Sequence, residues 1–166
     1  MTNGRQHRFA LPAGYMLHWY EIDSVLGQGG FGITYLARDT NLNHWVAIKE
    51  FLPSDLASRT HDSSVEPISD GHSDTFGWGL QRFITEAQTL AKFRHPNIVL
   101  VYSVFEANNT AYMVMEYVEG RTLEDALKFK KIKGEAEFKR AVLALIDGLE
   151  LVHDAGFIHR DIKPEN

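Results

Sequence analysis

The last ten residues, FIHRDIKPEN, place an acid, a base and an amide within six positions. These side chains are Asp161, Lys163 and Asn166. Groups of this kind handle protons, neutralise developing charge and bind metal ions. No residue follows Asn166 in the sequence to complete a site around them. Earlier parts of the chain carry further residues that could act with them.

A glycine triplet lies near the beginning of the chain, where Gly27, Gly29 and Gly32 form G-x-G-x-x-G in LGQGGFGITY. Glycines lack a Cβ atom, so backbone N–H groups in such a loop can face phosphate oxygens. A plain hairpin turn explains the triplet equally well. A dinucleotide-binding fold would require a helix after the third glycine, and Glu50 lies near the distance expected for a ribose-binding acid. ITYLAR has a strand-like pattern, which argues against that alternative.

Lys49 stands at the end of the apolar stretch VAIKEF. An isolated lysine there would extend to solvent, but after a glycine-rich hairpin it lies beneath the loop, where it can reach phosphates. Glu86, in the helical stretch FITEAQTLAKF, is either a solvated side chain or the partner of Lys49. Arg82 or Lys92 could take Glu86 instead. Together with the other motifs, we expect the Lys49–Glu86 ion pair.

The elements that must position these residues are those of an α+β fold. Three stretches rich in β-branched and aromatic residues (19–27, 32–39 and 44–52) predict an antiparallel meander, and 98–118 adds two strands about the turn ANNT. Apolar residues at three- and four-residue spacing predict a helix over 80–91. After this five-stranded sheet, TLEDALKFKK predicts a short helix with Thr122 as N-cap, and EAEFKRAVLALIDGLELVHDAG a long one ending near Gly156.

Two stretches have no clear periodicity. Residues 1–18 are expected to be a flexible, weakly packed leader. Residues 53–79 contain six serines and four aspartates and are expected to be an insertion, ordered or flexible, with an inert surface loop as the default. The centre of the long helix, AVLALI, is apolar nearly all round, which indicates that a further segment should cover it.

Composition excludes several classes of function. A net charge of −5 does not favour binding to nucleic acid or to an anionic membrane. The chain has no cysteine, so it contains neither a disulfide nor a thiolate metal site. The sequence shows no signal peptide and no apolar stretch near the ~20 residues needed to span a bilayer. We therefore expect a cytoplasmic location, unless an anchor lies beyond residue 166.

Five motifs occur in the order typical of protein kinases. HRDIKPEN resembles the catalytic loop H-R-D-x-K-x-x-N, and it follows GQGGFG, VAIK, the EA of the helix, and the strand YMVMEYVEG. The lysine two residues after the aspartate resembles the serine/threonine-specific branch, and GITYLARD…VAIKEFLP looks like a bacterial subgroup. The resemblance covers residues 19–166. It implies a small lobe over 19–119, with the insertion 53–79, and the incomplete beginning of a helical large lobe over 120–166.

The resemblance implies that the Gly27–Gly32 loop covers the phosphates of ATP. Lys49, held by Glu86, would orient the α- and β-phosphates. Thr34 stands where the family usually has valine. Its methyl group can still pack on adenine, so we expect a modest effect, below about 1.5 kcal/mol, and nucleotide binding should survive.

The adenine ring would be contacted by side chains and backbone from the sheet and the segment after it. By resemblance, Leu26 and Ala47 would sandwich the ring. Met115 would be the gatekeeper residue, and the backbone of Glu116 and Val118 would hydrogen-bond the base.

The catalytic roles implied by the resemblance belong to the last eight residues. Asp161 would accept the proton of the substrate hydroxyl, Lys163 would stabilise the transferring phosphoryl group, and Asn166 would bind Mg²⁺. His159 and Arg160 would be structural, Arg160 as a possible partner for a phosphorylated activation loop.

The resemblance predicts an ATP- and Mg²⁺-dependent kinase acting on serine or threonine hydroxyls of a protein substrate. The family's D-F-G and A-P-E motifs do not follow Asn166 here. We therefore interpret the chain as a fragment that is inactive alone. A different interpretation is a non-catalytic module that binds a nucleotide or a protein partner. A stable, monodisperse chain would favour this second interpretation.

Overall fold

A computed structural model describes residues 9–159 and 162–165 of the chain. They fall into two compact units, and each is described by itself. Unit 1 runs to Lys92 and includes Leu100–Tyr117, and unit 2 comprises Phe93–Val99 and the chain from Val118 onward. The sequence placed the boundary between residues 119 and 120, so the assignment of Phe93–Val99 to unit 2 differs from that expectation. No described helix is long and apolar enough to cross a membrane.

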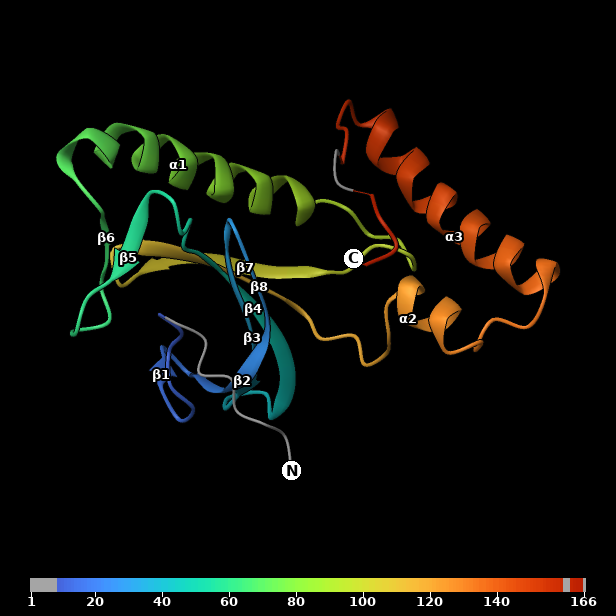
Figure 1. Cartoon of the computed structure of the whole chain (residues 1–166), viewed down its shortest axis with the longest axis horizontal. Coiled ribbons are helices and arrows are strands. Elements are labelled where there is room, and N and C mark those ends of the chain that lie inside the picture. Colours follow the sequence, from blue (N-terminus) through green and yellow to red (C-terminus); the bar gives the residue numbers. More distant parts are fainter. Residues whose placement is uncertain (1–8, 160–161, 166) are drawn as a thin grey trace. The chain divides into compact units, whose positions relative to one another are not determined.

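Unit 1 is built on a six-stranded antiparallel sheet in the order β1-β2-β3-β4-β8-β7 (Figure 1). The strands are β1 Met16–Leu17, β2 Tyr20–Gly29, β3 Gly32–Asp39, β4 His44–Phe51, β7 Val101–Ala107 and β8 Thr110–Glu116. Burial alternates along β3, as expected for a strand with two differently covered faces. The five predicted strands are present, and β1 is an addition at the sheet edge.

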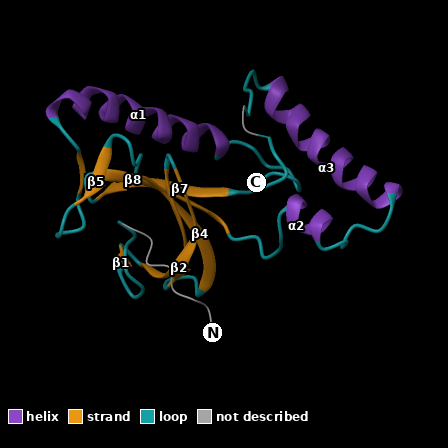
Figure 2. Cartoon of the chain, viewed as in Figure 1, coloured by secondary structure: helices purple, strands orange, loops and turns teal. Residues whose placement is uncertain are grey.

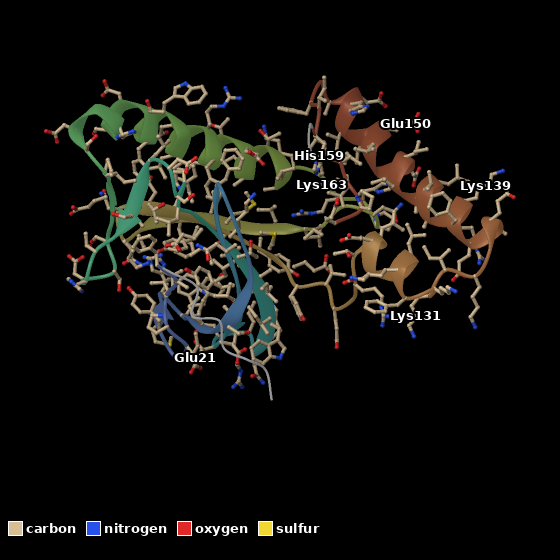
Figure 3. The ribbon with its side chains drawn as sticks, in the orientation of Figure 1. Glu21, Lys131, Lys139, Glu150, His159 and Lys163 are labelled. Carbon is tan, nitrogen blue, oxygen red and sulfur yellow. The ribbon has the colours of Figure 1, made fainter. Side chains whose placement is uncertain are left out.

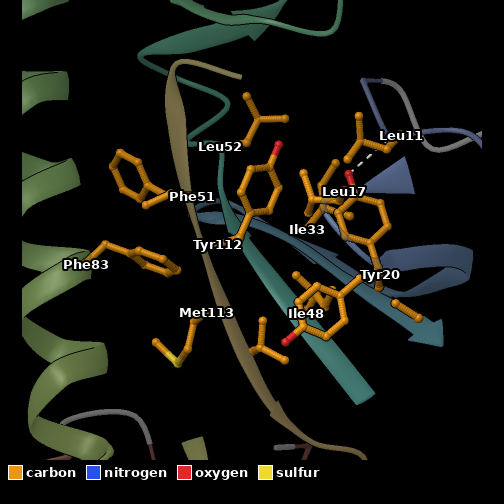
Figure 4. Close-up of a cluster of buried hydrophobic side chains, with 14 of the residues drawn as sticks. Leu11, Leu17, Tyr20, Ile33, Ile48, Phe51, Leu52, Phe83, Tyr112 and Met113 are labelled. Atoms are coloured by element: carbon orange, nitrogen blue, oxygen red, sulfur yellow. Dashed lines mark hydrogen bonds between the residues drawn. The ribbon is translucent and has the colours of Figure 1, made fainter. Parts of the chain in front are cut away.

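Helix α1, Ser73–Leu90, packs on one face of this sheet. The rings of Phe76 and Phe83 in α1 pack at a tilt against the ring of Phe51 in β4, with centroids 5.5 and 5.6 Å from that of Phe51. Figure 4 shows Phe51 and Phe83 on the α1 side, whereas Leu11, Leu17 and Tyr112 lie on the other side of the sheet. The predicted apolar spacing is confirmed. The helix begins seven residues before the predicted start at Leu80, because Phe76 adds one more inward turn.

The two stretches without periodicity contribute to the core. Leu11 and Leu17 are only 3% and 2% exposed, so the described part of the expected leader packs firmly. The expected insertion contains the hairpin β5 Ala57–Arg59 and β6 Val65–Pro67, the short 3₁₀ helix η1 Asp70–His72, and the first turns of α1. Ala57 and Val65 are buried in the same core cluster. Tertiary contacts therefore hold residues 9–18 and the polar stretch 53–79 in place.

Unit 2 contains α2 Leu123–Lys128 and α3 Glu135–Asp154 (Figure 2). The hydroxyl of Thr122 accepts a hydrogen bond from the Asp125 amide at 3.1 Å, which confirms the predicted N-cap. Gly148 is the one buried residue of α3, and several of its apolar side chains are exposed, including Leu143 at 53% and Ile146 at 52%. Much of the apolar surface of this helix is therefore exposed, as expected for a helix that a further segment should cover.

Candidate functional site

The glycine-rich loop is the turn of the β2–β3 hairpin. Gly27 lies opposite Thr34, Gly29 lies opposite Gly32, and Gly30 and Phe31 form the exposed turn. A Cβ atom added at Gly27, Gly29 or Gly30 would meet no atom within 4 Å. The backbone of these three residues therefore borders open space that a phosphate group could approach closely.

Gly32 has a different role from the other glycines of the loop. A Cβ atom at this position would lie 1.9 Å from the carbonyl oxygen of Glu50 on β4. Because real Cβ atoms never come so close to an oxygen, glycine here permits β3 and β4 to pair at Gly32 and Phe51. The third glycine of the motif is thus required by the sheet itself.

The sheet register brings most of the predicted nucleotide-contacting residues onto one face. Lys49 on β4 lies opposite Thr34 on β3, and Ala47 lies opposite Met115 on β8. Directly opposed residues share a face in an antiparallel sheet, and residues two apart along a strand do so too. Phe51 shares this periodicity with Lys49, so these side chains point to the face on which α1 packs.

Leu26 occupies the irregularity of β2 between Val25 and Gly27, where one extra residue interrupts the pairing with β3, and its side chain is 45% exposed. At the other end of the site, the amide of Glu116 donates to the carbonyl of Leu100 at 2.8 Å. This amide is therefore used within unit 1. A contact between Glu116 and an adenine base would depend on the Glu116 carbonyl group. Val118 belongs to unit 2 and is exposed.

The expected ion pair between Lys49 and Glu86 is not formed in this structure. The ion pairs among the described residues are Arg59–Glu50 and His95–Asp147. Helix α1 directs Phe83 and Ala87 into the core, which leaves Glu86 exposed, while Lys49 is half-buried on β4. The spacing correctly placed Glu86 in the middle of the helix, but the packing of α1 turns it towards solvent.

The catalytic-loop candidates are described only in part. Asp161, Arg160 and Asn166 lie outside the described residues, so the structure gives no geometry for the proposed base or metal ligand. His159 and Lys163 are described and exposed in the stretch that follows α3 (Figure 3). The carbonyl of Pro164 accepts a hydrogen bond from the Glu124 amide at 2.8 Å, which ties this stretch to the first turn of α2.

A buried polar network on the opposite face of the sheet was not predicted. The Glu50 carboxylate is fully buried and accepts hydrogen bonds from the hydroxyls of Tyr35 at 2.8 Å and Tyr112 at 2.6 Å. It also forms the ion pair with Arg59 of β5. The sequence offered two signals for this network. One is an acid directly after Lys49 in an apolar strand, and the other is a single arginine within the 53–79 stretch.

Burial and charge both shift the pKa values of this network. Removal from water raises the pKa of Tyr35 and Tyr112 well above the usual value of 10, and the adjacent Glu50 carboxylate raises each further. For Arg59, burial alone would lower the pKa, but Glu50 outweighs it through charge and hydrogen bonding, so the pKa is raised. Arg59 therefore remains charged and Tyr35 and Tyr112 remain neutral across the physiological range.

This network predicts a loss of stability at alkaline pH. The tyrosine pKa values are raised in the folded state, so their contribution is present below pH 10 and is lost as the pH rises above it. We expect the free energy of unfolding to fall by about 3 kcal/mol from pH 9 to pH 11 through these two residues. Urea denaturation at several pH values measures this change.

Two variants serve as controls for the alkaline prediction. The double variant Tyr35→Phe/Tyr112→Phe should lose most of the pH dependence, because neither phenol remains to ionise in the unfolded chain. Tyr102→Phe removes the phenol of a tyrosine that is 49% exposed. This variant should keep the pH dependence of the parent chain. An unchanged pH dependence in the double variant would contradict the assignment.

Comparison with known proteins identifies the family. The protein kinase domain model matches residues 20–166. The serine/threonine-protein kinase PknB of Mycobacterium tuberculosis is 39% identical over 154 residues, which cover 89% of this chain and 21% of that protein. A probable PknB of Bifidobacterium longum is 33% identical, with 89% and 20% covered. The chain belongs to the protein kinase family and spans about a fifth of the length of these curated relatives.

Solved structures support the same conclusion. The structure described as the PpkA-294 apo form matches with a TM-score of 0.88 and 39% identity, covering 95% of this chain and 57% of that one. The PknI kinase domain of M. tuberculosis matches with a TM-score of 0.68 and 25% identity, covering 95% and 56%. The α+β fold predicted from the sequence, a kinase small lobe followed by the beginning of the large lobe, is thereby confirmed.

Proposed function

We propose that the whole protein to which this chain belongs transfers the γ-phosphoryl group of ATP to serine or threonine hydroxyls of a protein substrate. The observation that carries the proposal is the geometry of unit 1 in a chain of this family. An open glycine turn and Lys49 lie on adjacent paired strands, and Thr34, Ala47, Lys49 and Met115 share one face of the sheet.

The residues fit the phosphate groups of a nucleotide. Backbone N–H groups around Gly27, Gly29 and Gly30 can approach phosphate oxygens, because no neighbouring atom limits the space where a side chain would stand. The Lys49 ammonium can neutralise part of the phosphate charge. ATP supplies the phosphoryl group, and the family uses it with Mg²⁺. Phosphoryl transfer demands chiefly alignment and positive charge, and the loop and Lys49 would provide both at the nucleotide.

The remaining roles follow from the family pattern. Asp161 would accept the proton of the attacking hydroxyl, Lys163 would stabilise the transferring group, and Asn166 would bind Mg²⁺. A pair between Glu86 and Lys49 would require a movement of α1 or of the Lys49 side chain, since the two are not paired here. We expect the 166-residue chain alone to transfer no phosphate, because the family pattern places further required motifs after Asn166. Phosphate transfer by the purified chain would contradict this expectation.

Substitution of Lys49 tests the proposed function. In the whole protein, Lys49→Met should reduce kcat/KM for phosphorylation of a protein substrate by about 10²–10³-fold or more, because it removes a positive charge at the phosphates. Transfer of radiolabelled phosphate from ATP measures this loss. Lys131→Met is the control, because it removes an exposed lysine that has no proposed role in the site. This variant should retain activity. Full activity of Lys49→Met would remove Lys49 from its proposed role.

A further inference from the structure

The turn of the glycine-rich loop is held by the polypeptide that follows β4. The amide of Leu52 donates to the carbonyl of Phe31, and the amide of Ser54 donates to the carbonyl of Gly30, both at 3.2 Å. These bonds continue the β3–β4 pairing beyond its last pair, Gly32 and Phe51. The loop turn is therefore attached on its β3 side to the first residues of the segment 52–69, which we call the tether segment.

The tether segment is itself fixed to the sheet. Leu52, Ala57 and Val65 are at most 3% exposed. The amide of Val65 donates to Asn108 O at 2.8 Å, and the side-chain amide of Asn109 donates to Val65 O at 2.8 Å. The hairpin of the tether segment is thus joined to the β7–β8 turn, which makes it a folded part of unit 1.

Arg59 is the residue that connects the tether segment to the rest of the network. Its guanidinium donates from Nε to Phe9 O at 2.6 Å and from Nη1 to Ser63 O at 2.7 Å, and Nη2 pairs with the Glu50 carboxylate. The side chains of Arg59 and Glu50 are 7% and 0% exposed. With so little solvent available, each charge depends on the other for compensation.

Glu50 transmits this attachment to the site. Its side chain lies in the network, while the neighbouring Lys49 points to the opposite face and the neighbouring Phe51 pairs with Gly32. Its carbonyl oxygen is the atom that makes glycine necessary at position 32. A displacement of Glu50 would therefore disturb Lys49 and the base of the glycine-rich loop together.

We propose that Arg59 is a positioning residue for the glycine-rich loop and Lys49, acting through Glu50 and the tether segment. Its consequence for nucleotide binding rests on the proposed function above. Without the Arg59 contacts, residues 52–54 detach more often from Gly30 and Phe31, and the loop samples more conformations. A nucleotide must then order the loop when it binds, so its affinity falls.

Site-resolved amide hydrogen exchange on the 166-residue chain tests the proposal directly. In Arg59→Met, protection of the Leu52 and Ser54 amides should fall about tenfold or more, while the Ile48 and Val114 amides in the sheet centre follow the global loss of stability. The control Ile22→Ala removes buried apolar atoms from β2 outside the network, so it should lower protection at Ile48 and Val114 and change Leu52 and Ser54 much less, because detachment of residues 52–54 leaves Ile22 buried. Unchanged protection of Leu52 and Ser54 in Arg59→Met, or an equally large loss at these two amides in Ile22→Ala, would overturn the proposal.

Two further variants keep the test decisive if Arg59→Met does not fold. Arg59→Lys retains the charge but cannot reproduce three donors in a planar fork, so selective loss of protection at Leu52 and Ser54 should persist. Glu50→Gln removes the acceptor charge and should release the same amides. If both variants leave protection at Leu52 and Ser54 as in the parent chain, Arg59 is not a positioning residue.

Titration with Mg·ATP separates this proposal from the proposed function. We expect Arg59→Met and Arg59→Lys to bind about tenfold more weakly than Ile22→Ala. Equal affinity despite selective amide release would overturn the link between Arg59 and the nucleotide. If the parent chain does not bind Mg·ATP, the proposed nucleotide site fails in this chain. The exchange experiment still decides the role of Arg59.

Discussion

Replacing Arg59 by methionine is expected to lower the free energy of unfolding by about 3–5 kcal/mol. The substitution leaves the fully buried Glu50 carboxylate without its cation, and the hydroxyls of Tyr35 and Tyr112 cannot neutralise the charge. It also removes the donors to Phe9 O and Ser63 O. Urea denaturation followed by tryptophan fluorescence is a suitable measurement, because all three tryptophans belong to unit 1.

Two comparisons isolate the buried charge as the cause. Arg82→Met removes an exposed arginine that lies 4.8 Å from the ring centroid of Trp78, and it should cost no more than about 1 kcal/mol. The double variant Glu50→Gln/Arg59→Met removes both charges and should be more stable than Arg59→Met alone. A loss in Arg59→Met no larger than that in Arg82→Met would show that the ion pair has no special weight.

The sheet and helices were predictable because their signals are local. The alternating residues of GITYLARD match the alternating burial of β3, and the apolar spacing around Phe83 matches the buried face of α1. The glycine loop and Lys49 could be placed on neighbouring strands for the same reason, since a short hairpin fixes the register. Local pattern therefore identified the strands that carry the site.

The parts that could not be predicted depend on contacts between distant residues. Arg59 and Glu50 are paired through the tertiary fold, and the buried Leu11 donates its amide to the Tyr35 hydroxyl at 3.1 Å. The 53–79 stretch is rich in serine and aspartate, so its composition did not indicate that Ala57 and Val65 would be buried. Likewise, whether Glu86 meets Lys49 depends on the rotation of α1, which helical periodicity alone does not determine. Side-chain pairing was therefore less predictable than backbone structure.

Substitution by alanine should affect Gly32 and Gly29 of the loop differently. Gly32→Ala is expected to lower the free energy of unfolding by about 3 kcal/mol or more, because the new methyl group would overlap the Glu50 carbonyl oxygen. Relief requires β3 to separate from β4 at Gly32 and Phe51, which also strains the Leu52 bond to Phe31. Urea denaturation followed by tryptophan fluorescence measures the loss.

Gly29→Ala is the matched substitution within the same motif. Its methyl group meets no atom within 4 Å and the backbone is outside the left-handed region, so stability should change by no more than about 1 kcal/mol. Affinity for Mg·ATP should nevertheless fall, because the methyl group enters the space through which a phosphate would approach the backbone. Equal destabilisation by the two alanines would contradict the structural role of Gly32. Unchanged nucleotide affinity in Gly29→Ala would contradict the phosphate role of the turn, so the pair separates the glycine that builds the sheet from the glycine that admits the ligand.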